Sequence, residues 1–589
     1  MKVARARLLD RIGTRVWSQG NALTRPFRRR AWVDAVLVLG LCGTLFGLLE
    51  FAREWTGTPR PTIDIDLSPL ALPTYTFFSM TRGLVAYLIS LGFTLVYAFW
   101  AAKDPRAERL LVPLLDILQS IPVLGFMPGL VLALVALFPG SNIGLELAAI
   151  VMIFTGQAWN MTFSFYHSLK SVPHDLRETS VVYRFSWWER FKWVELPFGT
   201  TGLVWNSMMS MAGGWFFLMI TEAFHLGDHD FRLPGLGSYM SVAAHEGNVS
   251  AMVLAVLAMM TMIVGLDQLL WRPVVVWAQR FRVEETSAAE VPRSWFIDLL
   301  RRSKLVRRIE HRYRRRTHLR APSPPPVPPS PPPPVRPGDG PLALLPWAAL
   351  VALAAAMGWG ALQLLRLLSR LDWSHWSVLA LAGLTTLGRV LVSTAIGTAW
   401  TVPLGLAVGL SPRVSRVFQP VAQVMASFPA PMLFPAAIAL FHAAGVGLGV
   451  GSIVLMLLGT QWYILFNVIA GASSVPSDLR EAAVAFRMPR RDRFWTLYLP
   501  AVFPYLVTGW VTAAGGAWNA SIVAEYVTYR GSTLETFGLG AAISRAAEQG
   551  HFAELTAAVL VMSVAVVCFN RLVWRRCYRL ASTRFSLTK

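Results

Sequence analysis

Long apolar runs alternate with short polar intervals along the 589 residues of this chain. Because a helix needs about 20 mostly apolar residues to cross the hydrocarbon core of a bilayer, each run can form one span. The runs begin near Ala31, Thr76, Leu110, Gly144, Phe198 and Val249, and again near Leu342, Ser377, Val417, Gly449, Ala501 and Glu554. The pattern predicts an all-α membrane protein with about twelve transmembrane helices in two sets of six.

The polar intervals are basic, and their charge predicts which side of the membrane they occupy. The chain has 54 Lys and Arg residues against 33 Asp and Glu, although only 15% of its residues are charged. Lys and Arg are retained in cytoplasmic loops, and the Arg-rich intervals fall on one side if the spans alternate. These intervals are 1–30, 103–109, 171–193, 271–320, 412–416, 480–493 and 571–589. Both termini are therefore expected in the cytoplasm. The basic clusters lack a soluble domain to carry them, so the expected partner is the lipid bilayer and not nucleic acid.

The same pattern divides the chain into a basic N-terminal extension at 1–30, a first half at 31–275, a linker at 276–341 and a second half at 342–589. The linker contains LLRRSKLVRRIEHRYRRR, which suits either an amphipathic helix on anionic lipid or a solvated basic tether. It continues with PSPPPVPPSPPPPVRPGDG, which predicts an extended polyproline spacer, with a ligand for a proline-binding domain as the alternative.

The two halves contain an internal repeat. SVPHDLRETSVVYRFSWWERFKWVELP at 171–197 and SVPSDLREAAVAFRMPRRDRFWTLYLP at 474–500 are identical at 13 of 27 positions and lie 303 residues apart. The same spacing maps Trp159 onto Trp462 and Glu222 onto Glu525, whereas upstream a spacing of 307 maps Arg82 onto Arg389. Because six spans are an even number, the halves are expected to be parallel repeats about a pseudo-twofold axis along the membrane normal.

Each repeated polar stretch predicts a helix, a turn and a second helix on the cytoplasmic face. In the later copy, Pro476 suits a first helical turn, and Asp478 places negative charge near the positive end of the helix dipole. Pro489 then ends this helix and starts the next one. In the earlier copy, Ser186 and Glu189 form a capping-box pattern that starts the second helix.

The spacing within these stretches resembles the EAA loop of inner-membrane permease subunits of ABC importers. The later copy reads Glu481-Ala482-Ala483, Arg487 and Leu499-Pro500, and the earlier copy reads Glu178-Thr179-Ser180, Arg184 and Leu196-Pro197. Where the family has Gly, both copies carry Arg, and the earlier copy lacks the two alanines. TTLGRVLVSTAIGTAWTVPLGLAVGLSPRVSR, SFPAPMLFPAAIALF and GGAWNASIVAEYV are similar to the branch for nitrate, sulfonates, taurine and bicarbonate.

The resemblance implies a fused pair of permeases in a bacterial inner membrane, each half carrying a coupling helix that docks on an ATPase. It implies two ABC ATPase subunits, identical or different, and a separate periplasmic or surface substrate-binding protein. The chain contains no GxxxxGK[ST] sequence, so ATP and Mg are expected on the partner subunits, with no cofactor on this chain. The residues that would couple to the ATPase are Asp175, Arg177, Glu178, Arg184, Asp478, Arg480, Glu481, Ala482, Ala483 and Arg487.

Polar and aromatic residues within the apolar runs are candidates for a translocation pathway. Ionisable residues at membrane depth are costly and face a cavity or a partner, although residues near the ends of a span can reach the interface instead. Amides equally form hydrogen bonds between helices, and tryptophans more often pack or lie at the interface. The candidates are Arg82, Gln157, Asn160, Trp215, Glu222, Arg389, Gln461, Trp518, Asn519 and Glu525. The prolines of IPVLGFMP and FPAPMLFP are expected to kink or break the third helix of each half.

These observations favour the permease component of an ATP-driven ABC importer for a small, anionic solute, working by alternating access between its halves. The alternatives are an ion-coupled secondary transporter that uses Glu222 and Glu525, and export by the same ABC architecture. A membrane enzyme finds no support, because no His, Cys or acidic cluster recurs at catalytic or metal-binding spacing.

Overall fold

The computed structural model describes residues 31–56, 64–120, 122–226, 229–281, 294–305, 308 and 345–585. The basic extension at 1–30 and the proline-rich spacer lie outside these residues. The chain divides into two compact units, of which one is Met1–Leu45 with Ser294–Trp373 and the other is Phe46–Arg293 with Ser374–Lys589. The second unit contains most of both repeats.

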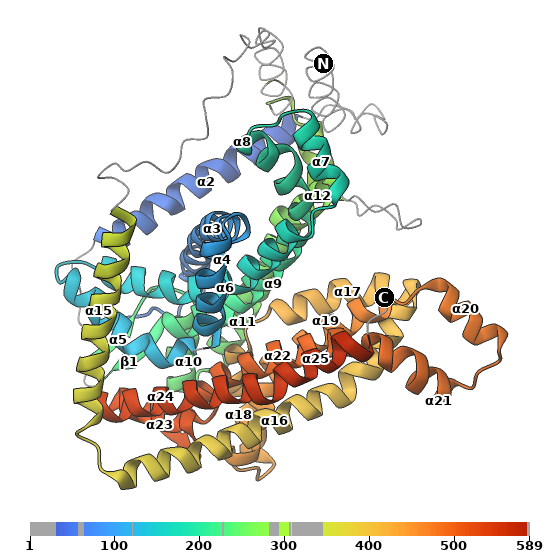
Figure 1. Ribbon diagram of the computed structural model, residues 1–589. Coiled ribbons are helices and arrows are strands. Elements are labelled where there is room, and N and C mark those ends of the chain that lie inside the picture. The colour runs from blue at the N-terminus through green and yellow to red at the C-terminus, as the bar shows by residue number, and fades with distance from the viewer. Residues whose placement is uncertain are drawn as a thin grey trace. The chain divides into compact units, whose positions relative to one another are not determined.

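Helices dominate the first half of the chain (Figure 1). Its elements are α2 (Ala31–Thr56), α3 (Leu72–Lys103), α4 (Pro105–Ser120), α5 (Val123–Leu137), α6 (Ile143–Lys170), α7 (His174–Val182), α8 (Trp187–Arg190), η2 (Phe191–Glu195), α9 (Leu196–Thr221), β1 (Ala223–Leu226), β2 (His229–Arg232), α10 (Leu236–Glu246), α11 (Val249–Leu266), η3 (Asp267–Trp271), α12 (Arg272–Ala278) and η4 (Gln279–Phe281). The linker contributes α13 (Trp295–Arg302).

The second half repeats this order of elements. It comprises α15 (Leu345–Leu368), α16 (Trp373–Leu410), α17 (Pro412–Ser427), η6 (Ala430–Leu433), α18 (Phe434–Ala443), α19 (Leu448–Ser473), α20 (Ser477–Ala485), α21 (Arg490–Asp492), η7 (Arg493–Tyr498), α22 (Leu499–Ala524), β3 (Tyr526–Tyr529), β4 (Ser532–Glu535), α23 (Leu539–Glu548), α24 (Phe552–Phe569), η8 (Asn570–Trp574) and α25 (Arg575–Arg584). Both halves therefore place a two-helix segment before a long apolar helix, and a hairpin after it.

The smaller unit holds the described linker residues from Ser294 onward. Ser294 caps α13 by accepting a hydrogen bond from the backbone N–H of Ile297. After this helix, the backbone N–H of Lys304 donates to the Asp34 carboxylate of α2 at 3.0 Å. Helix α13 includes the first four residues of the basic stretch at 299–316, most of which lies outside the described residues. An ordered contact ties the segment that follows α13 to the start of α2.

Twelve separate spans are not confirmed by the structure. Among the described residues, nine helices are long and apolar enough to cross a membrane. They are Val33–Trp55, Leu72–Lys103, Ile143–Lys170, Trp187–Thr221, Val249–Phe281, Trp373–Leu410, Leu448–Ser473, Arg490–Ala524 and Phe552–Ala581. Two of these spans include the second helix of a repeated polar stretch. In each, a π-helical turn, η2 or η7, accommodates the proline that follows, so that the helix continues without a break.

The third apolar run of each half is divided by proline, as the sequence predicts. Pro122 and Pro429 both adopt extended backbone conformations, with ψ of 117° and 119°, and each stands at the start of a new helix. In the second half, the helices on either side of this break differ in direction by 84°. The break leaves α5 with 15 residues, which is shorter than one membrane crossing.

Three long helices form the core of each half. In the first, Ala98 of α3 packs with Met161 and Phe165 of α6 and Leu203 of α9. In the second, the equivalent helices α16, α19 and α22 meet through a cluster of buried aliphatic residues, namely Val402, Leu406, Ile464, Val468, Ala472, Val502, Leu506 and Ala513. The repeat seen in the sequence is therefore also a repeat of packing.

Two short antiparallel hairpins depart from the expected all-α fold. Strand β1 pairs with β2, and β3 pairs with β4, each over four residues. At the tip of the second hairpin, Arg530 and Gly531 both have positive φ, as a two-residue turn of this hand requires. The backbone N–H of Arg530 donates to the carbonyl of Ala244 at the end of α10, so this hairpin reaches from the second half onto the first.

Candidate functional site

A buried cluster of three charged side chains connects the core helices of the first half. Arg82 of α3 donates from Nε and Nη2 to the two carboxylate oxygens of Glu146 of α6, at 2.6 and 2.7 Å. Its Nη1 donates to Glu222, at the end of α9, at 2.6 Å. All three side chains are fully buried. One guanidinium thus holds two carboxylates in a fixed geometry, with a bidentate fork to Glu146.

Neutral donors complete the environment of the Glu222 carboxylate. The Ser79 hydroxyl donates to one oxygen at 2.7 Å, and the backbone N–H of Gly237 donates to the other at 2.7 Å. A Cβ atom on Gly235 would lie 2.3 Å from this carboxylate, so only glycine permits the loop before α10 to approach so closely. These donors offset part of the cost of burying two negative charges beside one positive charge.

The second half repeats this arrangement around Arg389 and Glu525. Arg389 of α16 donates to Glu525 at the end of α22 at 2.8 Å, and Thr386 takes the place of Ser79 at 2.9 Å from the same carboxylate. The backbone N–H of Gly540 donates to the remaining oxygen at 2.8 Å, and Gly538 makes the close approach that Gly235 makes in the first half. Four residues that the sequence suggested separately therefore form two ion pairs.

Several members of these clusters were not among the residues selected from the sequence. Glu146 is the most important of these, and its signal was available, since it is a carboxylate within an apolar run. Ser79 and Thr386 also share the 307-residue spacing that relates Arg82 to Arg389. Gly235 and Gly538 gave no local signal, because their role depends on a distant carboxylate.

The repeated polar stretches form a short helix that ends in a left-handed residue. After α7, the N–H of Phe185 donates to the carbonyl of Ser180 and the N–H of Arg184 to that of Val181; after α20, Met488 and Arg487 repeat both bonds. This pair of bonds is the Schellman motif, which places its penultimate residue at positive φ. Arg184 and Arg487 both have φ of 50°. The arginines at the family's Gly position thus adopt the conformation that Gly would adopt.

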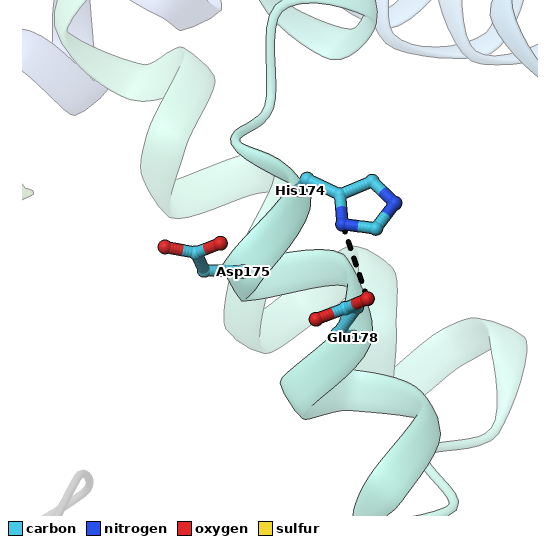
Figure 2. Close-up of side chains that lie close together, drawn as sticks. All are labelled: His174, Asp175 and Glu178. Carbon is cyan, nitrogen blue, oxygen red and sulfur yellow. Dashed lines mark ion pairs between the residues drawn. The ribbon is translucent and has the colours of Figure 1, made fainter.

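Most of the charged residues of the two stretches lie on the surface. Asp175 and Asp478 lie in the first turns of α7 and α20, near the positive end of each helix dipole. The exposed carboxylate of Glu178 pairs with His174 at 3.2 Å, and Figure 2 shows Asp175 turned away from that pair. Glu481 is likewise exposed. Ligand atoms of His174, Asp175 and Glu178 lie within 4.8 Å of one another, but all three residues are exposed.

Other residues of these stretches face inward and fix the helices to the rest of the fold. Arg177 donates to the carbonyls of Leu169 and Lys170 at the end of α6. Ala483 is buried, as is Ser180 at the equivalent position, while Ala482 and Arg480 are partly buried. The buried position of each short helix, Ser180 or Ala483, is therefore occupied by a small residue.

Exposed apolar side chains accompany these charges. Val181 and Val182 on the first stretch, and Val484 and Phe486 on the second, are all at least 60% exposed. A mixed charged and apolar surface of this kind is typical of a protein interaction site.

Comparison with known proteins identifies the family. The model of the binding-protein-dependent transport system inner membrane component matches residues 94–270 and again residues 401–576. The chain belongs to this family. It contains two copies of the domain, and each copy includes one of the repeated polar stretches.

Individual members of this family are similar to the chain at low sequence identity. The chain is 27% identical to the nitrate import permease protein of Leptolyngbya laminosa over 188 residues, which cover 32% of this chain and 64% of the relative. It is 25% identical to the bicarbonate transport system permease protein of Synechococcus elongatus over 190 residues, covering 32% and 65%. It is 26% identical to the taurine transport system permease protein of Escherichia coli over 197 residues, covering 33% and 65%. The chain thus spans just under two thirds of the length of these relatives.

The family is one of multi-pass inner-membrane proteins. In this chain, the remaining candidates for the translocation pathway differ in how deeply their side chains are buried. Gln157 is buried and accepts a hydrogen bond from Ser90. Asn160 is exposed, although its Nδ2 lies 3.5 Å from Ser210 Oγ. Gln461 is partly buried on α19, and Trp518 is buried within α22.

Two of the candidates lie where the two halves of the chain meet. Trp215 lines a small cavity together with Met211 and Asp267 of the first half and with Gln423 and Ser427 of α17. Asn519 of α22 accepts hydrogen bonds from the N–H groups of Val123 and Leu124, at the start of α5. These residues therefore contribute to contacts between the two halves.

Proposed function

We propose that this chain is the membrane-spanning permease component of an ATP-driven ABC importer, with its two halves acting as the two permease subunits. The observation that carries the proposal is the presence of two family domains on one chain, each with the same helix and left-handed turn. The family's description as binding-protein-dependent favours import over export and calls for a separate substrate-binding protein.

The two polar stretches are the proposed docking sites for two ABC ATPase subunits, which would bind ATP and Mg. Their exposed valines and Phe486 would enter the ATPase surface, with Glu178 and Glu481 at equivalent points beside them. Closure of the ATPase pair would pull on α7 and α20. Because each stretch continues through a π-helical turn into α9 or α22, movement there would pass directly to the core helices. This is the mechanical basis for alternating access between the halves.

The proposed solute is a small anion. The relatives are named for the import or transport of nitrate, bicarbonate and taurine. Nitrate and bicarbonate are small oxoanions, and taurine carries a sulfonate group. The orientation that fits this function places both termini and the Arg-rich intervals in the cytoplasm.

The structure favours this function over an ion-coupled secondary transporter. In that alternative, Glu222 and Glu525 would bind and release the coupling ion. Each carboxylate already accepts hydrogen bonds from an arginine, a hydroxyl and a backbone N–H. Both oxygens of each carboxylate are thus occupied by groups of the chain itself, which makes these residues poorly suited to bind and release a coupling ion.

Coupled ATP hydrolysis tests the proposal. The chain is purified with candidate ATPase subunits, and hydrolysis is compared between the wild type and the double variant Glu178→Lys with Glu481→Lys. We expect the ATPase to co-purify with the wild type and coupled hydrolysis to fall at least about tenfold in the variant, since charge reversal at a docking contact costs several kcal/mol.

Glu246→Lys is the matched control. Glu246 is exposed and lies in α10, which packs near the end of α9 remote from α7. Its reversal should leave hydrolysis unchanged. If no ATPase co-purifies, or if the double variant hydrolyses ATP as the wild type does, the proposed function is wrong.

A further inference from the structure

The two ion-pair clusters differ in the number of carboxylates around the arginine, and the difference leaves one donor of Arg389 without an acceptor among the described residues. The segment IGLELAAIV at the start of α6 aligns with VGLGVGSIV at the start of α19 at the 303-residue spacing that also relates Trp159 to Trp462. Glu146 in the first segment corresponds to Gly449 in the second. The second half therefore lacks the carboxylate that binds the arginine in the first half.

The missing carboxylate leaves donors of Arg389 available. In the first half, Glu146 accepts from both Nε and Nη2 of Arg82. In the described part of the second half, Nη1 of Arg389 donates to Glu525 and Phe537, and Nη2 donates to Thr536, but Nε has no acceptor. The side chain of Arg389 is 14% exposed, against 0% for Arg82. On the edge that Glu146 fills in the first half, Arg389 thus has an Nε without an acceptor and an Nη2 that donates only to Thr536 among the described residues.

Gly449 provides the space beside this edge. A Cβ atom at position 449 would lie 4.0 Å from Nη2 of Arg389 and 3.5 Å from the Thr536 hydroxyl oxygen, so a side chain there would point at the guanidinium. Glycine at this position therefore provides no side chain of the chain's own to close this edge of Arg389. A planar group with two oxygens matches the guanidinium edge, as the Glu146 carboxylate demonstrates in the first half.

The local charge also favours an anion. Gly449 is the second residue of α19, whose first turn contains no acidic side chain, whereas α6 has Glu146 in its first turn. The positive end of the α19 dipole and the guanidinium of Arg389 therefore lie together without the second negative charge that the first half provides. The first half further shows that this fold accepts two carboxylates around one arginine.

We propose that Arg389, Gly449 and Thr536 form a binding site for a small planar oxoanion, of the carboxylate, nitrate or bicarbonate class. The anion accepts hydrogen bonds from Nε and Nη2 of Arg389 in the position that the Glu146 carboxylate occupies in the first half. The site belongs to the second half alone, so the two pseudo-equivalent arginines have different roles. Arg82 is a permanent structural partner of its own chain, and Arg389 is the arginine that meets the solute. This assignment deepens the proposed function, on which its meaning for transport rests.

Binding to the purified chain, without ATPase or binding protein, tests the site. Saturation-transfer NMR with formate detects weak binding, and nitrate serves as the competitor. We expect a saturable formate signal that nitrate displaces. In Gly449→Glu, a carboxylate tethered to the chain should occupy the open edge and weaken formate binding at least tenfold. Gly449→Ala, whose added methyl meets both neighbours at ordinary contact distances, should retain binding.

Two further variants separate the site from general effects on folding. Arg389→Lys keeps the positive charge but loses the two-donor edge, and should weaken formate at least tenfold. Glu146→Gly opens the same edge on Arg82 and should add a second formate site where the protein remains folded, as judged by its thermal unfolding midpoint. No saturable formate signal in the wild type, or equal binding in Gly449→Glu, would overturn the proposal.

Failure of this site and failure of the proposed function give different results. If formate does not bind but Glu178→Lys with Glu481→Lys abolishes coupled hydrolysis, the anion site is wrong and the permease function stands. If formate binds as expected but coupled ATP hydrolysis is the same in the double variant as in the wild type, the anion site is supported and the ATP-driven function is wrong.

Discussion

The side-chain oxygen of Asn519 accepts a hydrogen bond from the backbone N–H of Val123, 396 residues earlier in the chain, at 2.8 Å. Val123 is the first residue of α5, and its N-cap Pro122 has no side-chain group that could satisfy the first N–H groups of the helix. A residue of the second half therefore caps a helix of the first half. This bond fixes the position of a helix too short to cross a membrane unaided.

Replacement of Asn519 by alanine should destabilise the protein. Loss of an N-cap side chain costs about 0.5–2 kcal/mol, and no other acceptor is available from alanine. Thermal unfolding of the purified protein measures the effect, and Asn519→Asp, which keeps an acceptor at the helix start, should lose much less. Thr512→Ala on the exposed side of the same helix is the control. An unfolding midpoint that is the same for Asn519→Ala and wild type would contradict the capping role.

Replacement of Arg184 or Arg487 by glycine should stabilise the protein. A non-glycine residue in the left-handed region is strained by about 1 kcal/mol, and glycine removes this strain. Each single Gly variant should therefore unfold at a higher temperature than the wild type, whereas Arg184→Val should unfold at a lower temperature because a β-branched side chain suits positive φ least. A stabilised Gly variant with reduced ATPase binding would show that the arginine side chains are retained for contact with the partner. Equal stability of the Gly and Val variants would mean that these residues are not left-handed in solution.

Loss of Arg82 should be more harmful than loss of Arg389. Arg82→Gln leaves two fully buried carboxylates without a cation, whereas Arg389→Gln leaves one. Removing one partner of a buried ion pair costs about 3–5 kcal/mol, and Arg82 belongs to two such pairs. Denaturant or thermal unfolding compares the variants. Adding Glu146→Gln to Arg82→Gln should recover part of the loss, because it removes one of the two uncompensated charges. If Arg389→Gln were as destabilising as Arg82→Gln, the asymmetry between the clusters would have no energetic consequence.

The two repeated polar stretches should respond differently to salt. In the first half, the buried carboxylate of Glu195 accepts hydrogen bonds from Lys103 at the end of α3 and from Arg190. In the second half, the equivalent residues Leu410 and Tyr498 pack against the apolar core of that half. Screening weakens ion pairs that are partly exposed, as Lys103 and Arg190 are, and leaves apolar contacts unweakened.

Hydrogen exchange measures this difference. The segment 174–195 should exchange faster in 1 M salt or in Glu195→Gln, where the anchoring carboxylate is lost, while 477–498 should change little. Glu189→Gln is the control, because that carboxylate accepts hydrogen bonds from Ser186 at the start of α8. Equal salt sensitivity of the two segments would contradict an ionic anchor in the first half.

The sequence determined the features that depend on neighbours along the chain. Apolar runs predicted most of the long helices, Pro122 and Pro429 predicted the divided third run, and the repeat predicted two copies of a helix, turn and helix. These follow from side-chain hydrophobicity, the missing N–H of proline and helix capping, which act over a few residues. The count of twelve spans is not confirmed, since a run of apolar residues does not reveal whether one helix or two short ones form within it.

Only the tertiary structure decided which distant residues meet. Arg82 and Glu222 lie 140 residues apart and touch only because α3 and α9 pack side by side, with Gly235 allowing the next loop to approach. The sequence could not assign Asn519 to the start of α5, nor show that Gly449 opens the edge of Arg389 that Glu146 closes on Arg82. Such contacts depend on which helix faces adjoin, and that is fixed by the packing of whole helices and not by local preference.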